Sequence, residues 1–240
     1  MSLPLLKRGY VGGVRRLRRT AERLGLLDRL EASESSRARW VRSLFGIYDS
    51  LDLVRLDWPW WTLPAIERTA SFLKQRQGST RVFEFGAGAS TVWLSKRSAE
   101  VISVEHDRDF AARLAPTLAA LPNVHVSVVP PTPATGRPGE RRSNRAGHTE
   151  WSFDAYVAAL ERAPGAFDLI VIDGRSRSAC LEVAVTKLAP GGLILFDNSD
   201  RKEYRSAIRD CGLQVQRLRG LAPALPFPSE TSLLGPASAT

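Results

Sequence analysis

The 240-residue chain is expected to adopt an α/β fold, a mostly parallel sheet with helices on both faces. Short apolar runs alternate with helix-like segments from residue 81 onward, and the runs are apolar throughout, as in strands buried on both faces. The first run breaks into a glycine turn that leads directly into a helix. The pattern predicts strands at 81–86, 100–105, 124–129, 167–173, 193–198 and 213–218, and helices at 89–97, 108–120, 152–162, 177–187 and 204–210.

The bulk composition is that of a globular protein with one domain and an appendage. Apolar residues make up 43% of the chain and charged residues 25%, which are ordinary values. No apolar run approaches the length of a membrane span, and no signal peptide is evident. The two cysteines, Cys180 and Cys211, are far apart and are expected to be reduced, as in a cytoplasmic protein.

Positive charge is concentrated near the N-terminus. The net charge is +9, and residues 1–42 carry eleven Lys/Arg and four acids, or +7 of that total. The pattern predicts a basic amphipathic helix with an apolar stripe at Val14, Leu17, Ala21, Leu24 and Leu27. The apolar stripe of this helix can pack on the core or lie on an anionic membrane, and its arginines could instead bind the phosphates of a nucleic acid. We therefore separate a basic helical region, 1–78, from the main domain, 79–240.

The rest of the N-terminal region is expected to be helical. A second helix is predicted from Ser33 or Ser36 to Tyr48, and a third from 63 to 76 with Thr62 as its cap. Clustered tryptophans lie between them and are expected to pack in a core or to form a substrate platform: Trp58, Trp60 and Trp61.

The glycine turn indicates a cofactor site. Gly86 and Gly88 follow the first strand, and glycines let a ligand lie against bare backbone. The glycine pattern of a dinucleotide-binding site has a third glycine at the position of Thr91. The Glu84 carboxylate would repel a pyrophosphate but can accept a hydrogen bond from a cationic amino group. Glu105, nineteen residues after Gly86, suits ribose hydroxyls. A cofactor with a ribose and an amino-acid end but no phosphates is S-adenosylmethionine.

These residues resemble the class I S-adenosylmethionine-dependent methyltransferases over roughly residues 80–235. The resemblance implies a Rossmann-like seven-stranded sheet, completed by a short strand near 231–234. It implies that His106 flanks the adenine, and His106 is also a candidate base. The cofactor-binding set is then Glu84, Gly86, Ala87, Gly88, Ser90, Glu105 and His106.

Polar residues follow the fourth and fifth strands, which we expect to be neighbours. Asp173, Asp197 and Asn198 offer oxygen ligands that suit Mg²⁺, and this placement resembles catechol and caffeoyl-coenzyme-A O-methyltransferases. The resemblance makes Asp173 and Asp197 catalytic candidates, with the use of a metal left open. The alternative is that the acids cap turns or bind ligands without metal.

The catechol enzymes carry a lysine base three residues after the first Asp, and Ser176 stands at that position here. The flanking Arg175 and Arg177 cannot act as bases but could clamp a carboxylate or phosphate.

A Pro-, Gly- and Arg-rich segment at 130–150 interrupts the main domain. Such a stretch is expected to be a lid or disordered. Its arginines would favour an acidic acceptor if it closes: Arg137, Arg141, Arg142 and Arg145.

The function these features favour is O-methylation of a small molecule or a glycan- or lipid-linked acceptor, by in-line SN2 transfer from S-adenosylmethionine. Several blocks, including Trp58–Thr62 and Asp197–Arg201, are similar to little-characterised bacterial methyltransferases linked to glycan or secondary-metabolite assembly. The alternatives are a nucleic-acid methyltransferase, a non-catalytic cofactor-binding or membrane-adaptor protein, and a dehydrogenase. We expect a cytoplasmic protein with peripheral contact at the inner face of the membrane through the basic helix.

Overall fold

The structure is a computed structural model that describes residues 17–33, 35–46, 50–145 and 147–236. Its centre is a seven-stranded sheet in the order β3-β2-β1-β6-β7-β9-β8. The first five of these strands are parallel, whereas β9 runs antiparallel to both β7 and β8. The predicted strands are confirmed, including the last one: β1 Arg81–Phe85, β2 Glu100–Glu105, β3 Val124–Val128, β6 Phe167–Ile172, β7 Leu188–Asp197, β8 Gln214–Leu221 and β9 Pro228–Gly235.

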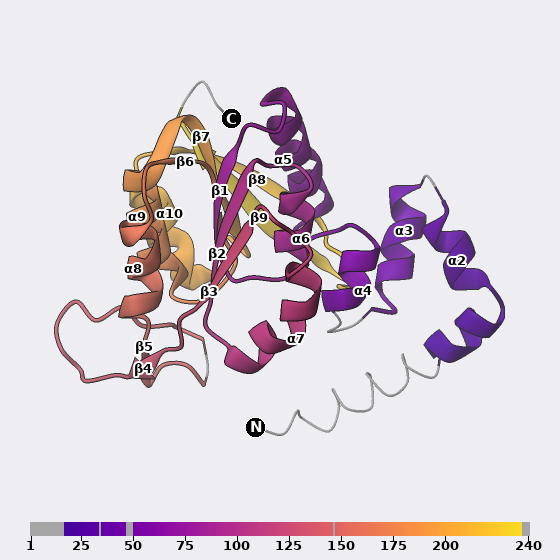
Figure 1. Ribbon diagram of the computed structural model, residues 1–240, viewed down its shortest axis with the longest axis horizontal. Coiled ribbons are helices and arrows are strands. Elements are labelled where there is room, and N and C mark those ends of the chain that lie inside the picture. The colour runs from indigo at the N-terminus through magenta and orange to yellow at the C-terminus, as the bar shows by residue number, and fades with distance from the viewer. Residues whose placement is uncertain (1–16, 34, 47–49, 146, 237–240) are drawn as a thin grey trace.

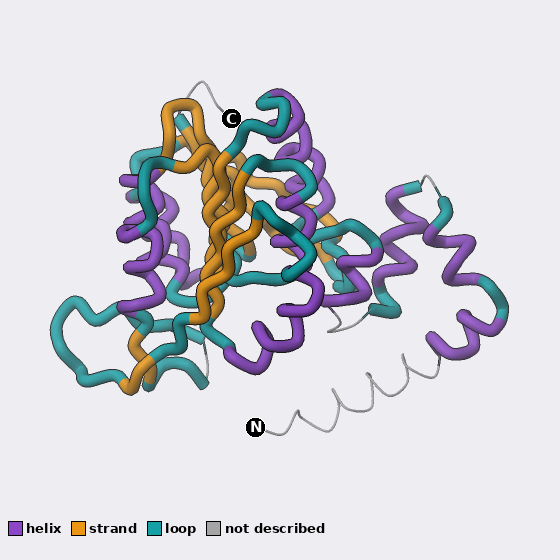
Figure 2. Tube along the Cα trace, viewed as in Figure 1, coloured by secondary structure: helices purple, strands orange, loops and turns teal. Residues whose placement is uncertain are grey.

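Helices cover both faces of this sheet (Figure 1, Figure 2). One face carries α8 (Asp154–Arg162), α9 (Arg177–Lys187) and α10 (Arg205–Asp210), and the other carries α5 (Leu63–Gln75), α6 (Ala89–Ser95) and α7 (Arg108–Leu118). Side chains alternate along each strand between two separate cores. On β1, Phe83 and Phe85 pack with α8 and α9, whereas Val82 packs with α5. This alternation also decides where a polar side chain within a strand must point.

The basic N-terminal region forms several short helices instead of one long helix. Helical residues 17–23 end at a turn, and α2 (Leu26–Glu31) starts after Gly25, whose left-handed φ of 63° interrupts the helix. Ala21 and Leu27 of the predicted stripe are buried, but Leu17 and Leu24 are 63% and 69% exposed. Val14 lies outside the described residues.

The next two helices differ in detail from the expectation. Helix α3 (Ser36–Ser43) is capped by Ser35, whose Oγ accepts from the amide of Ala38, so the predicted caps at Ser33 and Ser36 were wrong. It ends before Tyr48, and α4 (Ser50–Arg55) was not predicted. The Thr62 hydroxyl also does not cap α5, since it donates to the Leu218 carbonyl at 2.9 Å.

Packing joins the N-terminal helices to the main domain beside the glycine turn. Leu53 and Leu56, from α4 and just after it, form a small core with Ala89, the first residue of α6. A buried ion pair, Arg42–Asp52 at 3.0 Å, ties α3 to α4. None of the described helices is long and apolar enough to cross a membrane.

The tryptophan cluster is part of the core. Trp61 is fully buried and meets Trp93 of α6 edge to face, with ring centroids 5.7 Å apart. Trp58 is also buried in this core, and the partly buried Trp60 packs beside Leu53 and Ala89. Packing therefore accounts for the three tryptophans.

The 130–150 segment is a hydrogen-bonded loop at one end of the sheet. Two-residue strands β4 (Thr132–Pro133) and β5 (Trp151–Ser152) pair at its base. The amide of Phe153 donates to the Arg141 carbonyl at 2.7 Å, and the Ser176 hydroxyl donates to the Arg142 carbonyl at 2.9 Å. The last bond ties the loop to the turn that follows β6.

Candidate functional site

The glycine turn after β1 lies directly against the turn after β6. Gly86 has a left-handed φ of 95°, and a Cβ added there would lie 3.0 Å from the Cα of Gly174. The amide of Asp173 donates to the Phe85 carbonyl at 3.0 Å. Gly88 has open space instead, since an added Cβ would meet only Ser90 Oγ, at 3.9 Å. The turn therefore offers bare backbone on its open side, as a bound cofactor requires.

Glu84 does not point toward this open side. Its side chain is fully buried and accepts hydrogen bonds from the hydroxyls of Ser90 at 2.5 Å, Thr91 at 2.6 Å and Ser103 at 2.5 Å. Burial raises the pKa of Glu84 to about 7, against the effect of the three donors. The predicted contact with the cofactor's amino group is therefore corrected: Glu84 braces the turn from inside.

The physical reason is the strand register. Glu84 is directly opposite Ser103 on β2, on the face that α6 covers with Ser90 and Thr91. Thr91 Oγ1 also accepts from the amide of Gly88 at 2.9 Å, so the same hydroxyl connects Glu84 to the turn. Ser90 was predicted to bind cofactor, but its hydroxyl is directed to Glu84. A serine within the apolar β2 run was the sequence feature that could have revealed this arrangement.

Glu105 lies where a ribose acid is expected, at the end of β2. Its Oε1 accepts from the amides of His106 and Asp107, each at 2.8 Å, which fixes the carboxylate. No hydrogen bond to its other oxygen, Oε2, is found among the described residues, so this oxygen is available to a ligand.

His106 belongs to an aromatic cluster beneath the 130–150 loop. Its ring centroid is 5.8 Å from His148, 6.0 Å from Phe153 and 6.1 Å from Tyr156, and its Nδ1 lies 2.7 Å from Glu105 Oε1. This place beside Glu105 suits a residue that flanks an adenine. Within the described part of the chain, no contact joins His106 to Asp173 or Asp197, so its role as a base stays a prediction without structural support.

Arg177 connects the two strand-end acids. Strands β6 and β7 are neighbours, and Asp173 and Asp197 fall at their carboxyl ends, as predicted. The Arg177 guanidinium lies 2.8 Å from Asp173 Oδ1 and 3.7 Å from Asp197 Oδ2, and it is only 5% exposed. It also donates to the backbone carbonyls of Asp173, Gly174 and Asp197. This pairing of Arg177 with both acids was not predicted from the sequence.

Asp197 is held from a second side. Its Oδ1 accepts from Thr231 Oγ1 on β9 at 2.7 Å. Burial and the neighbouring Asp173 charge raise the pKa of Asp197, although Arg177 opposes this effect. Asp173 is more accessible, with a side chain 20% exposed. Of the two acids, Asp173 is therefore the one that can face an acceptor.

The predicted Mg²⁺ ligands do not fit a metal ion in this arrangement. Arg177 already supplies a cation between Asp173 and Asp197, and a metal there would have to displace it. Asn198 adopts a left-handed φ of 53°, and its Oδ1 accepts from Arg201 at 2.6 Å. The described residues contain no cluster of three His, Cys, Asp or Glu side chains able to hold a metal.

Comparison with known proteins agrees with this geometry. The family described as a methyltransferase domain matches residues 83–199, which span β1 to the residues after β7. Residues 83–199 therefore match a methyltransferase domain, in agreement with the resemblance to class I S-adenosylmethionine-dependent methyltransferases. No curated protein matches the chain.

Solved structures resemble the fold. Cofactor-bound Rv0187 from MTB is 20% identical, with a TM-score of 0.50, over 77% of this chain and 86% of that one. A methyltransferase-like protein from Silicibacter pomeroyi is 22% identical, with a TM-score of 0.43, over 70% and 87%. An rRNA methylase from Streptococcus thermophilus is 10% identical, with a TM-score of 0.48, over 70% and 93%. At these identities the likeness concerns the fold alone.

Proposed function

We propose that the protein transfers the methyl group of S-adenosylmethionine to a hydroxyl of a small-molecule or glycan- or lipid-linked acceptor, without a metal. The observation that carries this proposal is the ionic group Asp173–Arg177–Asp197 at the ends of β6 and β7. The turn that begins at Asp173 contacts the glycine turn, so the acids stand beside the proposed cofactor site.

The chemistry follows from this proximity. The cofactor's sulfonium is already reactive, so the protein has to align an acceptor oxygen behind the methyl group. The methyl carbon forms a bond to that oxygen as its bond to sulfur breaks, which leaves S-adenosylhomocysteine. Asp173 accepts the hydroxyl proton, and Arg177 orients the Asp173 carboxylate by donating to its Oδ1.

The cofactor would lie across the open side of the glycine turn. Gly86, Ala87 and Gly88 would present backbone to its methionine end, and Glu105 Oε2 would accept from the ribose hydroxyls. Glu84 and Ser90 would act only through the turn that they brace.

Calorimetric titration of S-adenosylhomocysteine into the full chain tests the cofactor site. Glu105→Ala should lower the affinity by about tenfold or more, because a charged hydrogen bond is lost. Glu100→Ala is the matched control: it lies on the same strand at the opposite end, where Glu100 pairs with Arg81. Equal affinities for the two variants would contradict the ribose assignment, and the absence of binding to the unmodified protein would remove the proposal.

The same titration tests whether the protein uses Mg²⁺. Repeated with Mg²⁺ and with chelator, it should give one affinity, and Mg²⁺ alone should give no binding heat. A screen of methyl-labelled S-adenosylmethionine against hydroxyl acceptors, amine acceptors and RNA then tests the reaction. Label recovered only on amines or RNA would overturn the proposed transfer to a hydroxyl.

We also propose that the N-terminal helices contact an anionic membrane surface. Leu17 and Leu24 are exposed on a segment rich in arginine, and that combination suits a lipid interface. Their packing in a protein core would have left them buried, like Ala21 and Leu27.

A further inference from the structure

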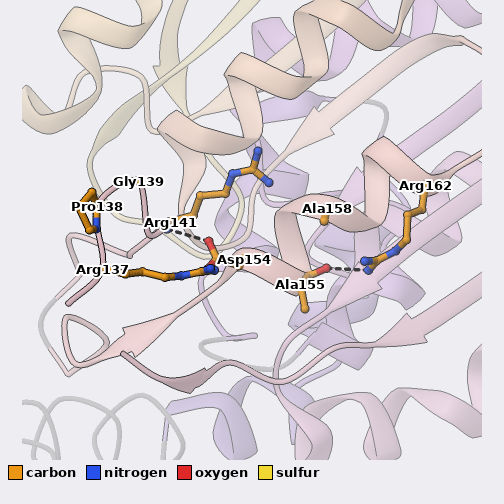
Figure 3. A pocket seen from close by; sticks show the side chains of 8 residues that line it. All are labelled: Arg137, Pro138, Gly139, Arg141, Asp154, Ala155, Ala158 and Arg162. Carbon is orange, nitrogen blue, oxygen red and sulfur yellow. Dashed lines mark hydrogen bonds and ion pairs between the residues drawn. The ribbon is translucent and has the colours of Figure 1, made fainter. Parts of the chain in front are cut away.

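Most arginines of the 130–150 loop have a carboxylate partner. Figure 3 shows Arg137 meeting Asp154 beside a pocket of about 420 Å³ on α8. Arg141 lies 2.6 Å from Glu161 Oε1. A third arginine is paired within the loop itself, Arg142 with Glu140 at 2.8 Å. The two loop arginines that line this pocket, Arg137 and Arg141, are therefore neutralised by carboxylates of the protein.

Arg175 is different. It is half-buried on the turn after β6, and its Nε is buried with no hydrogen-bond partner in the described part of the chain. The one hydrogen bond of its guanidinium among those residues is long, 3.4 Å from Nη1 to the Gly174 carbonyl, and no carboxylate there forms an ion pair with it. Burial and the charges of Arg145 and Arg177 lower the pKa of Arg175, while Tyr156 and Glu105 act in the opposite direction.

His148 and Arg145 lie within electrostatic reach of Arg175. The His148 ring is 5.8 Å from His106, under the loop. Burial and the charges of Arg175, His106 and Arg145 lower the pKa of His148, and only Asp107 opposes them. Arg145 forms no ion pair within the described ranges. Drawing the Arg175 guanidinium partly out of water without a counter-charge is costly, and a bound anion removes that cost.

We propose that Arg175, together with Arg145 and His148, binds an anionic oxygen group, a carboxylate or phosphate, of the methyl acceptor. This inference rests on the proposed function. Arg175 is two residues after Asp173 on the same turn, so an acceptor anchored by its anion is held close to the proton-accepting carboxylate. A guanidinium suits both anions because its parallel N–H groups match two oxygens.

The position of the loop supports this assignment. The Ser176 hydroxyl holds the Arg142 carbonyl, so the loop that carries Arg145 and His148 is fastened one residue after Arg175. The three groups therefore come from two segments that are joined at the site.

Proton NMR of the histidine ring resonances tests the site in the full chain. The chain has three histidines, so a His148→Gln variant identifies the His148 resonance. Millimolar inorganic phosphate, at constant ionic strength set with chloride, should raise the pKa of His148 by about half a unit or more, because an anion stabilises the protonated ring. Acetate in a parallel titration distinguishes a carboxylate preference from a phosphate preference.

Arg175→Gln should abolish this shift, and Arg137→Gln, which alters a paired surface arginine, should retain it. A His148 pKa that ignores both anions, or that shifts equally in the Arg175 variant, would overturn the inference. Loss of S-adenosylhomocysteine affinity in Arg175→Gln would instead assign Arg175 to the cofactor. If the unmodified protein binds S-adenosylhomocysteine while its His148 ignores both anions, the proposed function stands and this inference alone fails.

Discussion

Individual side chains at this site have roles other than those predicted from their residue type and position. Glu84 stands two residues before the first glycine, where a contact with the cofactor was predicted, yet three hydroxyls bind it inside the protein. Arg177 fills the place expected for a metal ion. In both cases burial decides the role, because a buried charge must be satisfied by neighbouring groups.

The buried Glu84 predicts a pH dependence of stability. Its folded-state pKa, about 7, lies above the ordinary value of 4.5, so the folded protein holds a proton that the unfolded chain releases between these values. This carboxyl therefore favours the folded state at acidic pH, and that contribution is lost as the pH rises to about 7. Glu84→Gln removes the titration.

Between about pH 5.5 and about pH 8, the unfolding free energy of the unmodified protein should fall by about 2 kcal/mol more than that of Glu84→Gln. Denaturant unfolding at the two pH values measures the difference, and Glu100→Gln on the exposed end of β2 serves as control. Parallel pH profiles for Glu84→Gln and the unmodified protein would mean that Glu84 is already ionised in the fold.

At the scale of elements, the two turns that follow β1 and β6 act as one unit. Gly86 and Gly174 meet backbone to backbone, and a Cβ on Gly174 would come within 1.9 Å of the Tyr156 hydroxyl. The contact places the glycine turn and the Asp173 turn side by side. The unit depends on residues without side chains more than on specific polar contacts.

Two alanine substitutions compare a strained glycine position of this turn with an unstrained one. Gly86→Ala should lower the unfolding free energy by about 1–3 kcal/mol, since it combines a left-handed φ with a 3.0 Å contact. The backbone at Gly88 is extended and leaves room for a Cβ, so Gly88→Ala should change the unfolding free energy by less than about 0.5 kcal/mol. Chemical denaturation measures both, and equal losses would show that the turn does not have this geometry.

The sequence predicted the sheet well because buried parallel strands leave a strong apolar pattern. The central strands of the sheet were placed within a few residues, as was the position of Glu105 at the end of β2. The errors lie where tertiary contacts override local pattern. Gly25 interrupts a regular apolar stripe, and the Arg142 carbonyl bound by Ser176 helps fasten a loop that composition alone made a candidate for disorder.

For the molecule as a whole, charge and function are divided between two regions. The N-terminal segment carries most of the excess positive charge, but part of it is used internally, as in the buried Arg42–Asp52 pair. The exposed Arg19 and Arg23, with the exposed Leu17 and Leu24, form the described part of the surface proposed to meet a membrane.

Vesicle sedimentation tests this surface. The protein should sediment with phosphatidylserine-containing vesicles and not with phosphatidylcholine alone, and added salt should weaken the association. The double variant Leu17→Ser, Leu24→Ser should bind the vesicles about tenfold more weakly, since it lacks two apolar side chains that would enter the lipid. Phe227→Ser, a similarly exposed apolar side chain outside the N-terminal region, should bind unchanged. Equal binding by all three proteins would exclude the proposed contact.

The backbone contact between the β1 and β6 turns has a consequence for the evolution of this chain. Since main chain sets the spacing between the β1 turn and the β6 turn, where the methyl donor and the acceptor are proposed to bind, changes of side chain elsewhere leave that spacing intact. The 130–150 loop is attached beside this fixed frame through the carbonyl of Arg142 and could be rewritten in length and charge without moving it. A lineage built on this frame can therefore acquire new substrates by exchanging one loop, while the reaction itself is inherited.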